Sequence, residues 1–312
     1  MLRRRSLLTA GLAALAGCAS TPPPGRAVEV ADGVFLVPGS GGVADERNLG
    51  RIGNAGFVVG PAGVIAVDTG TSFLHGQAML AEIARVTPQP VKVALVTHTR
   101  PEFLFGGGAF QARGIPVRMH DRTARLMASR CETCLKQLRQ QVGEGPLAGT
   151  AMYKPDQTYE SGGDLGSALI GRPVRVLHFG HSSGPGDVAV LDERSATLFA
   201  GGLLDQRRIP DIQDSVLDGW KAALAQLQGL GVRTVIPGHG PAASSELVGT
   251  VARYLAALER RVREMVAAGD SLLGVADAAD LPEFERWDQY DTIHRRNASI
   301  AFVRFEREML FK

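Results

Sequence analysis

Short apolar runs alternate with amphipathic stretches from Ala55 to the end of the chain. Residues 57–59 and 64–67 predict two strands, and the intervening turn Gly60-Pro61-Ala62-Gly63 makes them a hairpin. Further strands are predicted at 91–97, 116–119, 174–179, 187–191, 197–200 and 234–236, and helices at 78–86, 121–142 (capped by Asp121), 217–227, 246–268 and 292–310. This alternation predicts sheets flanked by helices, an α/β fold, with a loop at 143–165.

Chain length and net charge are those of a globular protein that does not bind nucleic acid. A chain of 312 residues with 45% hydrophobic residues can bury a large core, in one domain or two. The formal net charge is only +2, and no long run of Lys and Arg stands out. Nucleic acid is therefore not an expected partner, because its binding needs clustered positive charge.

The first residues, MLRRRSLLTAGLAALAGCAS, have the composition of an export signal. Arg4-Arg5 matches the twin-arginine pattern, and Leu15-Ala16-Gly17-Cys18 matches a bacterial lipobox, in which the cysteine receives a lipid. We expect a signal peptide at 1–18, a Pro-rich linker at 19–27 and a folded domain at 28–312. The protein would then be exported, either attached to the membrane through a lipidated Cys18 or, if the signal is a plain cleaved one, released into the periplasm.

Cys131 and Cys134 lie three residues apart in a stretch with a helical pattern, so their side chains share one face. A zinc half-site would lack its other two ligands nearby, and a thioredoxin-like motif would lack its preceding strand. Three interpretations stay open: a structural disulfide, an idle pair of thiols, and redox chemistry.

Three of the seven histidines follow predicted strands in turns marked by Gly or Pro. His98 follows the strand at 91–97, His181 lies in F-G-H-S-S-G, and His239 lies in I-P-G-H-G-P. Ligands bind at such strand ends in α/β sheets, so the pattern favours a shared site.

Five motifs now resemble those of the metallo-β-lactamase fold superfamily: V-I-A-V-D-T-G (64–70), T-H-T-R-P-E-F (97–103), F-G-H-S-S-G (179–184), L-F-A-G-G (198–202) and V-I-P-G-H-G-P (235–241). Other stretches, including R-I-P-D-I-Q-D-S-V-L-D-G-W (208–220), look most like its quinoprotein relay system zinc metallohydrolase branch. The resemblance implies a four-layer αβ/βα sandwich with two zinc ions that activate water at the rim between the sheets.

The resemblance also implies roles for individual residues, and the chain departs from the pattern at several of them. His98 and His181 match ligands of the first metal, and His239 matches a ligand of the second. Glu102 stands where the pattern has Asp. Arg100 and Phe103 stand in place of His, and Gly202 in place of the Asp that bridges both metals. An Arg guanidinium stays protonated and has only donors, and Phe has no lone pair, so neither can bind zinc.

Two functions remain open. His98, Glu102, His181 and His239 could hold one zinc in a hydrolase for a small ester, lactone, thioester or amide. Alternatively, these residues are a hydrogen-bonded relic in a catalytically inactive protein. Arg100 would then bind an anionic ligand, or a partner in a quinoprotein dehydrogenase pathway, unless it pairs with Glu102. Asp205 and Asp187 are weak replacements for the missing bridge, because Asp205 would need a tight turn to return.

Overall fold

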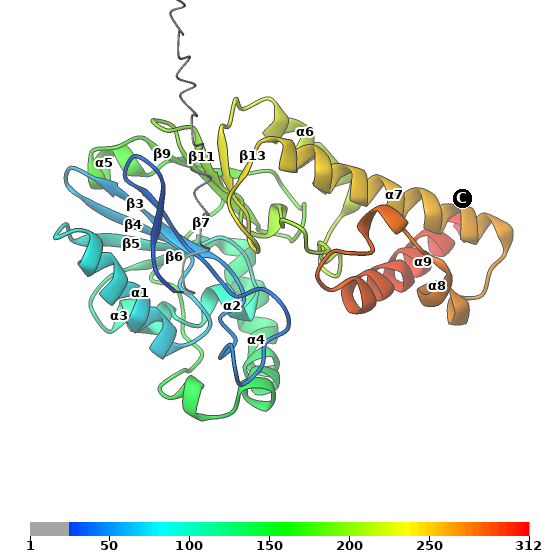
Figure 1. Ribbon diagram of the computed structural model, residues 1–312, viewed down its shortest axis with the longest axis horizontal. Coiled ribbons are helices and arrows are strands. Elements are labelled where there is room, and N and C mark those ends of the chain that lie inside the picture. Colours follow the sequence, from blue (N-terminus) through cyan, green and yellow to red (C-terminus); the bar gives the residue numbers. More distant parts are fainter. Residues whose placement is uncertain (1–24, 312) are drawn as a thin grey trace, which may run out of the picture.

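Two β-sheets form the middle of the molecule (Figure 1). The computed structural model describes residues 25–311, so the predicted signal peptide and the Cys18 lipid site lie outside the described residues. The first sheet has the order β1 (Val28–Ala31), β2 (Val34–Val37), β3 (Ala55–Gly60), β4 (Gly63–Val67), β5 (Val91–Val96), β6 (Val117–His120) and β7 (Gln157–Tyr159). The second has the order β13 (Ala243–Ser244), β12 (Thr234–Ile236), β11 (Thr197–Phe199), β10 (Val188–Asp192), β9 (Val174–His178) and β8 (Gly163–Asp164).

The strand pairings follow the predicted pattern. β3 and β4 form the predicted antiparallel hairpin, with Gly60 paired to Gly63 across the turn. β4, β5 and β6 then run parallel, and β11 pairs with β12 in parallel. Parallel neighbours end at the same edge of a sheet, so the loops that follow them gather at one rim.

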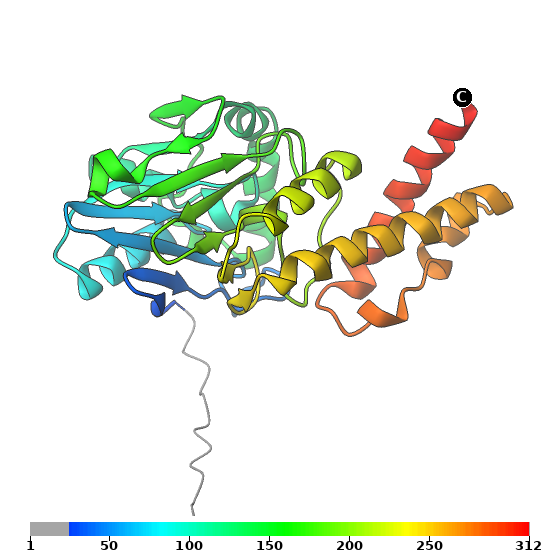
Figure 2. The same ribbon diagram turned by 90° about the horizontal axis from the view of Figure 1, so that it is seen from above.

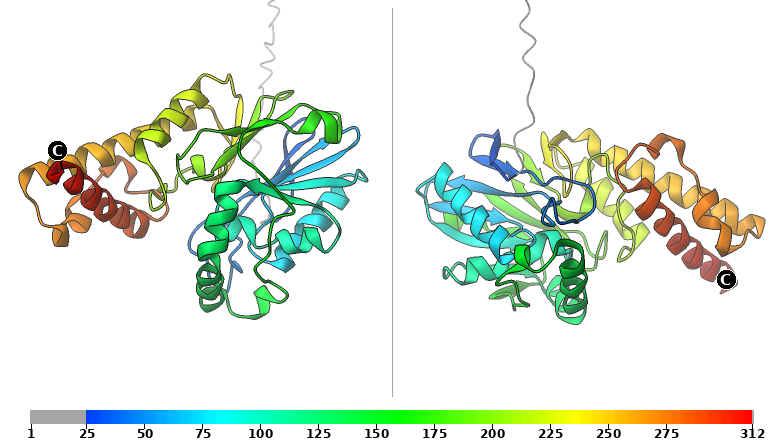
Figure 3. Two further views of the ribbon diagram at one scale, coloured as in Figure 1. Left: turned by 180° about the vertical axis from the view of Figure 1, so that it is seen from behind. Right: turned by 60° about the horizontal axis from the view of Figure 1, so that its bottom comes forward.

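Helices cover the outer faces of both sheets. The first sheet carries α1 (Phe73–Val86), α2 (Pro101–Leu104), α3 (Gly107–Gln111) and α4 (Asp121–Val142), with α5 (Gly166–Ile170) near its edge. The second is followed by α6 (Leu217–Gln228), α7 (Glu246–Ala268), α8 (Leu272–Ala278) and α9 (Arg295–Leu310). Helix α7 extends beyond the second sheet (Figure 2). Together with α8 and α9 it forms an arm that projects from the sandwich (Figure 3).

Three clusters of buried hydrophobic residues hold the layers of helices and sheets together. One lies between the sheets and contains Ile65 and Val67 from the first sheet and Val188 and Val190 from the second. A second cluster packs the first sheet against α1 and α4, and a third packs the second sheet against α6, α7 and α9. The order is helix, sheet, sheet, helix, so the predicted four-layer αβ/βα sandwich is confirmed.

Several boundaries differ from the prediction. α1 begins at Phe73 because the Ser72 side chain caps it. The cap of α4 is His120, whose side chain accepts from the Arg122 N–H, so Asp121 is instead the first helical residue. The region 143–165 is not only loop, since β7 and β8 lie within it. Between residues 25 and 311, no helix is long and apolar enough to cross a bilayer.

Candidate functional site

A pocket of about 60 Å³ lies at the rim between the sheets, where the predicted strand-end loops meet. The loops after β5, β11 and β12 supply His98, Asp205 and His239, and α2 supplies Glu102. Its lining residues are His98, Thr99, Arg100, Glu102, Leu126, Ser183, Gly184, Pro185, Asp187, Gly202, Asp205, Arg208, Ile209, Asp211, Asp214, His239 and Ile293. A pocket of this size, with so many charged groups, suits a small polar head group.

His98 is a buried, neutral imidazole. Its Nδ1 lies 2.8 Å from the Thr97 hydroxyl oxygen. Thr97 in turn donates its backbone N–H and hydroxyl to Asp68, which ties the end of β4 to the end of β5. Burial, followed by the charge of Arg100, lowers the pKa of His98 to about 3. Asp68 thus has a structural role at the ends of these two strands.

Phe103 fills the space beside the histidines. Its ring centroid is 4.3 Å from that of His98 and 5.3 Å from that of His239. The side chain is fully buried, and its ring presses on Gly53, where a Cβ would lie 2.5 Å from the Phe103 ring. The phenyl group is therefore a packed core element at a position where the family pattern has a metal ligand.

His239 is held by two carboxylates. Its Nδ1 lies 2.8 Å from Asp205 and its Nε2 lies 3.1 Å from Glu102. Burial by itself would lower the pKa of His239, but Asp205 and then Glu102 raise it above its ordinary value. Burial would likewise raise the pKa of Glu102, yet the hydrogen bond with His239 brings it down to about 2. The three side chains therefore form a carboxylate–imidazolium–carboxylate row.

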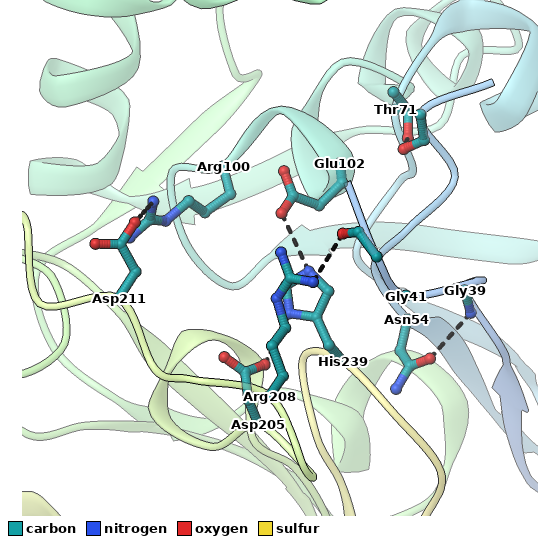
Figure 4. Close-up of polar contacts among 12 residues, drawn as sticks. Gly39, Gly41, Asn54, Thr71, Arg100, Glu102, Asp205, Arg208, Asp211 and His239 are labelled. Carbon is teal, nitrogen blue, oxygen red and sulfur yellow. Dashed lines mark hydrogen bonds and ion pairs between the residues drawn. The ribbon is translucent and has the colours of Figure 1, made fainter. Parts of the chain in front are cut away.

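Arg100 and Glu102 bind different side chains: Arg100 binds Asp211, and Glu102 binds His239 (Figure 4). Arg100 Nη1 donates to Asp211 at 2.6 Å, and Asp211 also accepts from Arg296. Burial alone would lower the pKa of Arg100, but Asp211 and Glu102 raise it, so the guanidinium stays charged. The sequence left a pairing of Arg100 with Glu102 open, and the structure instead joins Arg100 to Asp211.

His181 does not share the pocket with the other two histidines. It is exposed, and its Nε2 lies 2.7 Å from the carbonyl oxygen of Asp214. The predicted set of His98, Glu102, His181 and His239 is therefore not gathered round one point. Three of its members line the pocket, and the fourth lies outside it.

Gly202 has no room for the aspartate of the family pattern. A Cβ there would lie 2.8 Å from His98 Cδ2 and 2.9 Å from Asp187 Oδ2. Asp187 occupies the space in its stead, accepting from the Ser183 hydroxyl at 2.7 Å. Burial raises the pKa of Asp187 to about 6. Asp187 and Asp205, which the sequence analysis rated as weak candidates, both line the pocket. Asp205 follows the 3-10 turn Gly201–Leu203, whereas Asp187 directly precedes β10.

Sequence reasoning missed three charged residues of the pocket: Arg208, Asp211 and Asp214. Arg208 bonds the Gly42 carbonyl at 2.8 Å and pairs with Asp288, and Asp214 makes a two-bond pair with Arg130. All three lie in the R-I-P-D-I-Q-D stretch, whose three charged residues in seven could have indicated that it lines the site.

These residues do not fit a zinc site. Among residues 25–311, no group of three or more His, Cys, Asp or Glu side chains could hold a metal ion. His239 uses both ring nitrogens on carboxylates, Phe103 packs against both imidazoles, and Arg100 brings a fixed positive charge. A cation would have to displace an ion-paired and packed interior to bind.

Residues 49–239 match the family model of the metallo-beta-lactamase superfamily. The chain belongs to this superfamily. The structure resembles a metallo-beta-lactamase from Pontibacter korlensis (TM-score 0.60, 21% identity, 74% of this chain and 98% of the other) and the DIM-1 metallo-beta-lactamase (TM-score 0.57, 17% identity, 75% and 98%). At these identities the likeness shows the fold alone.

One curated relative is a linear primary-alkylsulfatase from Pseudomonas sp. (strain ATCC 19151). It is 23% identical over an alignment of 233 residues, and the match covers 63% of this chain and 43% of the relative. The aligned region thus spans less than half of that enzyme. The likeness to the quinoprotein relay branch stays a prediction.

Proposed function

We propose that this chain is a zinc-independent binding protein within a hydrolase superfamily, and that its ligand is an amphiphilic organic anion such as an alkyl sulfate. Arg100 carries the proposal. Its guanidinium lines the pocket from a position where the family pattern has a zinc-binding histidine. A guanidinium supplies a permanent positive charge and planar donors, which suit an oxyanion.

Each acidic residue of the pocket already has a hydrogen-bond partner, which weakens its repulsion of an anion. Glu102 and Asp205 share His239, Asp211 accepts from Arg100 and Arg296, and Asp214 pairs with Arg130. Asp187 accepts a hydrogen bond from Ser183, and burial raises its pKa to about 6, so this carboxyl group is mostly neutral only below that pH. The paired carboxylates fix the positive groups in place.

Two guanidinium groups retain bonding capacity. In the part of the chain that the structure describes, Arg100 and Arg208 make their hydrogen bonds through Nη1 alone. Some buried side-chain nitrogens in the described residues have no hydrogen-bond partner, but those of Arg100 and Arg208 are not among them. Their unbonded nitrogens are therefore not sealed in the interior. Both side chains line the same pocket, so their remaining N–H groups are available to an oxyanion.

The pocket wall also offers an apolar surface. Leu126, Ile209 and Ile293 line it together with the charged groups. A ligand with a charged head and an alkyl tail would use both kinds of surface. The distant likeness to a linear primary-alkylsulfatase supports an alkyl sulfate as the class to test first.

Calorimetric titration with hexyl sulfate tests the proposal, with hexanesulfonate as an anion that cannot be hydrolysed at an ester bond and hexanol as an uncharged control. We expect the two anions to bind in the presence of EDTA, hexanol not to bind, and no inorganic sulfate to be released. Release of sulfate that EDTA abolishes and zinc restores would instead establish a zinc hydrolase. Failure of both anions to bind would overturn the proposal.

Arg100→Leu should weaken binding of hexanesulfonate by about tenfold or more, because a charge-assisted hydrogen bond is lost. Arg125→Leu is the matched control. Arg125 lies on α4, pairs with Asp121 and has a side chain that is 75% exposed. Equal affinities for the two variants would rule out Arg100 as the anion site.

A further inference from the structure

Cys131 and Cys134 lie in the middle of α4, one turn apart, and both are free thiols. Cys131 is fully buried in the cluster beneath the first sheet, whereas Cys134 is half-buried. Residues three apart on an α-helix have Cα atoms roughly 5 Å apart, which lies within the range that a disulfide bond requires. Their Cβ atoms are about 5–6 Å apart on a regular helix, beyond the roughly 3.5–4.5 Å of a relaxed disulfide, so closing the bridge requires a local distortion of α4.

Cys134 faces a second pocket, of about 220 Å³, between α4, α2 and the loop before β3. Pro101, Glu102 and Arg208 also line this pocket, so it adjoins the candidate site through two shared residues. A small molecule in this pocket would reach Cys134, while Cys131 lies behind it in the core.

The surroundings of Cys134 favour its thiolate. A side-chain hydrogen bond from Cys131 lowers the pKa of Cys134 to about 6, and the nearby charge of Arg130 contributes in the same direction. The same hydrogen bond raises the pKa of Cys131. The thiolate is the nucleophile in thiol–disulfide exchange, so the more accessible member of the pair is also the more reactive one.

From this arrangement we infer that Cys131 and Cys134 form a reversible thiol–disulfide site, at which Cys134 reacts with a low-molecular-weight disulfide and Cys131 closes the bridge. The Cys134 thiolate attacks one sulfur of the small disulfide, forms a mixed disulfide and releases one thiolate. Cys131 then loses its proton and attacks the Cys134 sulfur, which expels the second thiol. Overall, two protein thiols are oxidised and one small disulfide is reduced to two thiols. The site does not depend on the anion ligand proposed above.

Oxidised glutathione is the probe for the test, applied to the folded full-length chain. Trypsin cuts after Arg130 and Lys136, so residues 131–136 form one peptide that excludes Cys18. After maleimide quenching, we expect this peptide to contain an internal disulfide. In Cys131→Ser, the reaction should stop at a glutathione adduct on Cys134. In Cys134→Ser, Cys131 should stay unmodified, because it is buried.

The pH dependence of the first step provides a second measurement that needs no variant. The initial rate at Cys134 should change less than about twofold between pH 7 and pH 9, whereas a synthetic peptide of residues 131–136 should accelerate roughly twentyfold, as an ordinary thiol does. Modification of Cys131 before Cys134 would overturn the inference. So would a folded chain that resists glutathione under conditions in which the peptide reacts fully.

Discussion

The phenyl ring of Phe103 packs on the imidazole of His98, with 4.3 Å between the ring centroids. The same ring meets His239 edge-on. Two histidines that match metal ligands of the family thus share contact with one hydrocarbon ring. The interior of the candidate site is therefore held by packing as well as by ion pairs.

Phe103→Ala should lower the free energy of unfolding by about 3–5 kcal/mol, because it leaves a cavity beside two buried imidazoles. Phe103→Leu should cost less, since Leu fills part of the space. Urea denaturation followed by fluorescence measures both. A Phe103→Ala variant as stable as the wild type would show that the ring is not packed as described.

Gly202→Asp should destabilise the protein rather than rebuild a metal bridge. The Cβ alone would meet His98 and Asp187 at 2.8 and 2.9 Å, and a second carboxylate would then face that of Asp187. Gly202→Ala separates the two effects, since it adds the Cβ without the charge. We expect both variants to unfold at lower temperature, Asp more than Ala. An undiminished melting temperature for Gly202→Asp would contradict this account.

Wild-type protein purified from zinc-supplemented medium should carry well below one zinc ion per chain, as measured by plasma mass spectrometry. Arg100→His alone should raise this content little, because Phe103 still packs against both histidines and supplies no ligand. Combining it with Phe103→His should raise the content further, with Arg125→His as the control. Two tightly bound zinc ions in the wild type would disprove the zinc-independent interpretation.

Asp187 should make stability depend on pH. Burial raises its pKa from 3.8 to about 6, so the folded state favours the protonated form, and this contribution is lost as pH rises from about 4 through about 6. Asp187→Asn can keep the hydrogen bond from Ser183 and removes the titration. The variant should gain on the order of 2 kcal/mol over the wild type between pH 4 and pH 8. A stability difference that stays the same at both pH values would contradict the raised pKa.

Much of the fold could be predicted because its signals are local. The hairpin at 55–67 is encoded by two short apolar runs around a Gly-Pro turn, and α7 has the predicted bounds of 246–268. β1 and β2 were not predicted. β7 and β8 were also missed, because their few residues are mostly exposed and carry little apolar pattern.

The sequence by itself determined the superfamily and the rim where the site lies, since both follow from the order of the motifs. It also determined that Arg100, Phe103 and Gly202 cannot act as metal ligands, since this follows from side-chain chemistry. Export, lipidation and the pathway partner stay predictions, and the leader lies outside the described residues. Only the tertiary structure decided which side chains form ion pairs in the site. Arg100 pairs with Asp211, which is 111 residues away, and His239 with Glu102, which is 137 residues away. Such pairs depend on how two sheets pack, and side-chain charge alone does not specify which opposite charge will be nearest.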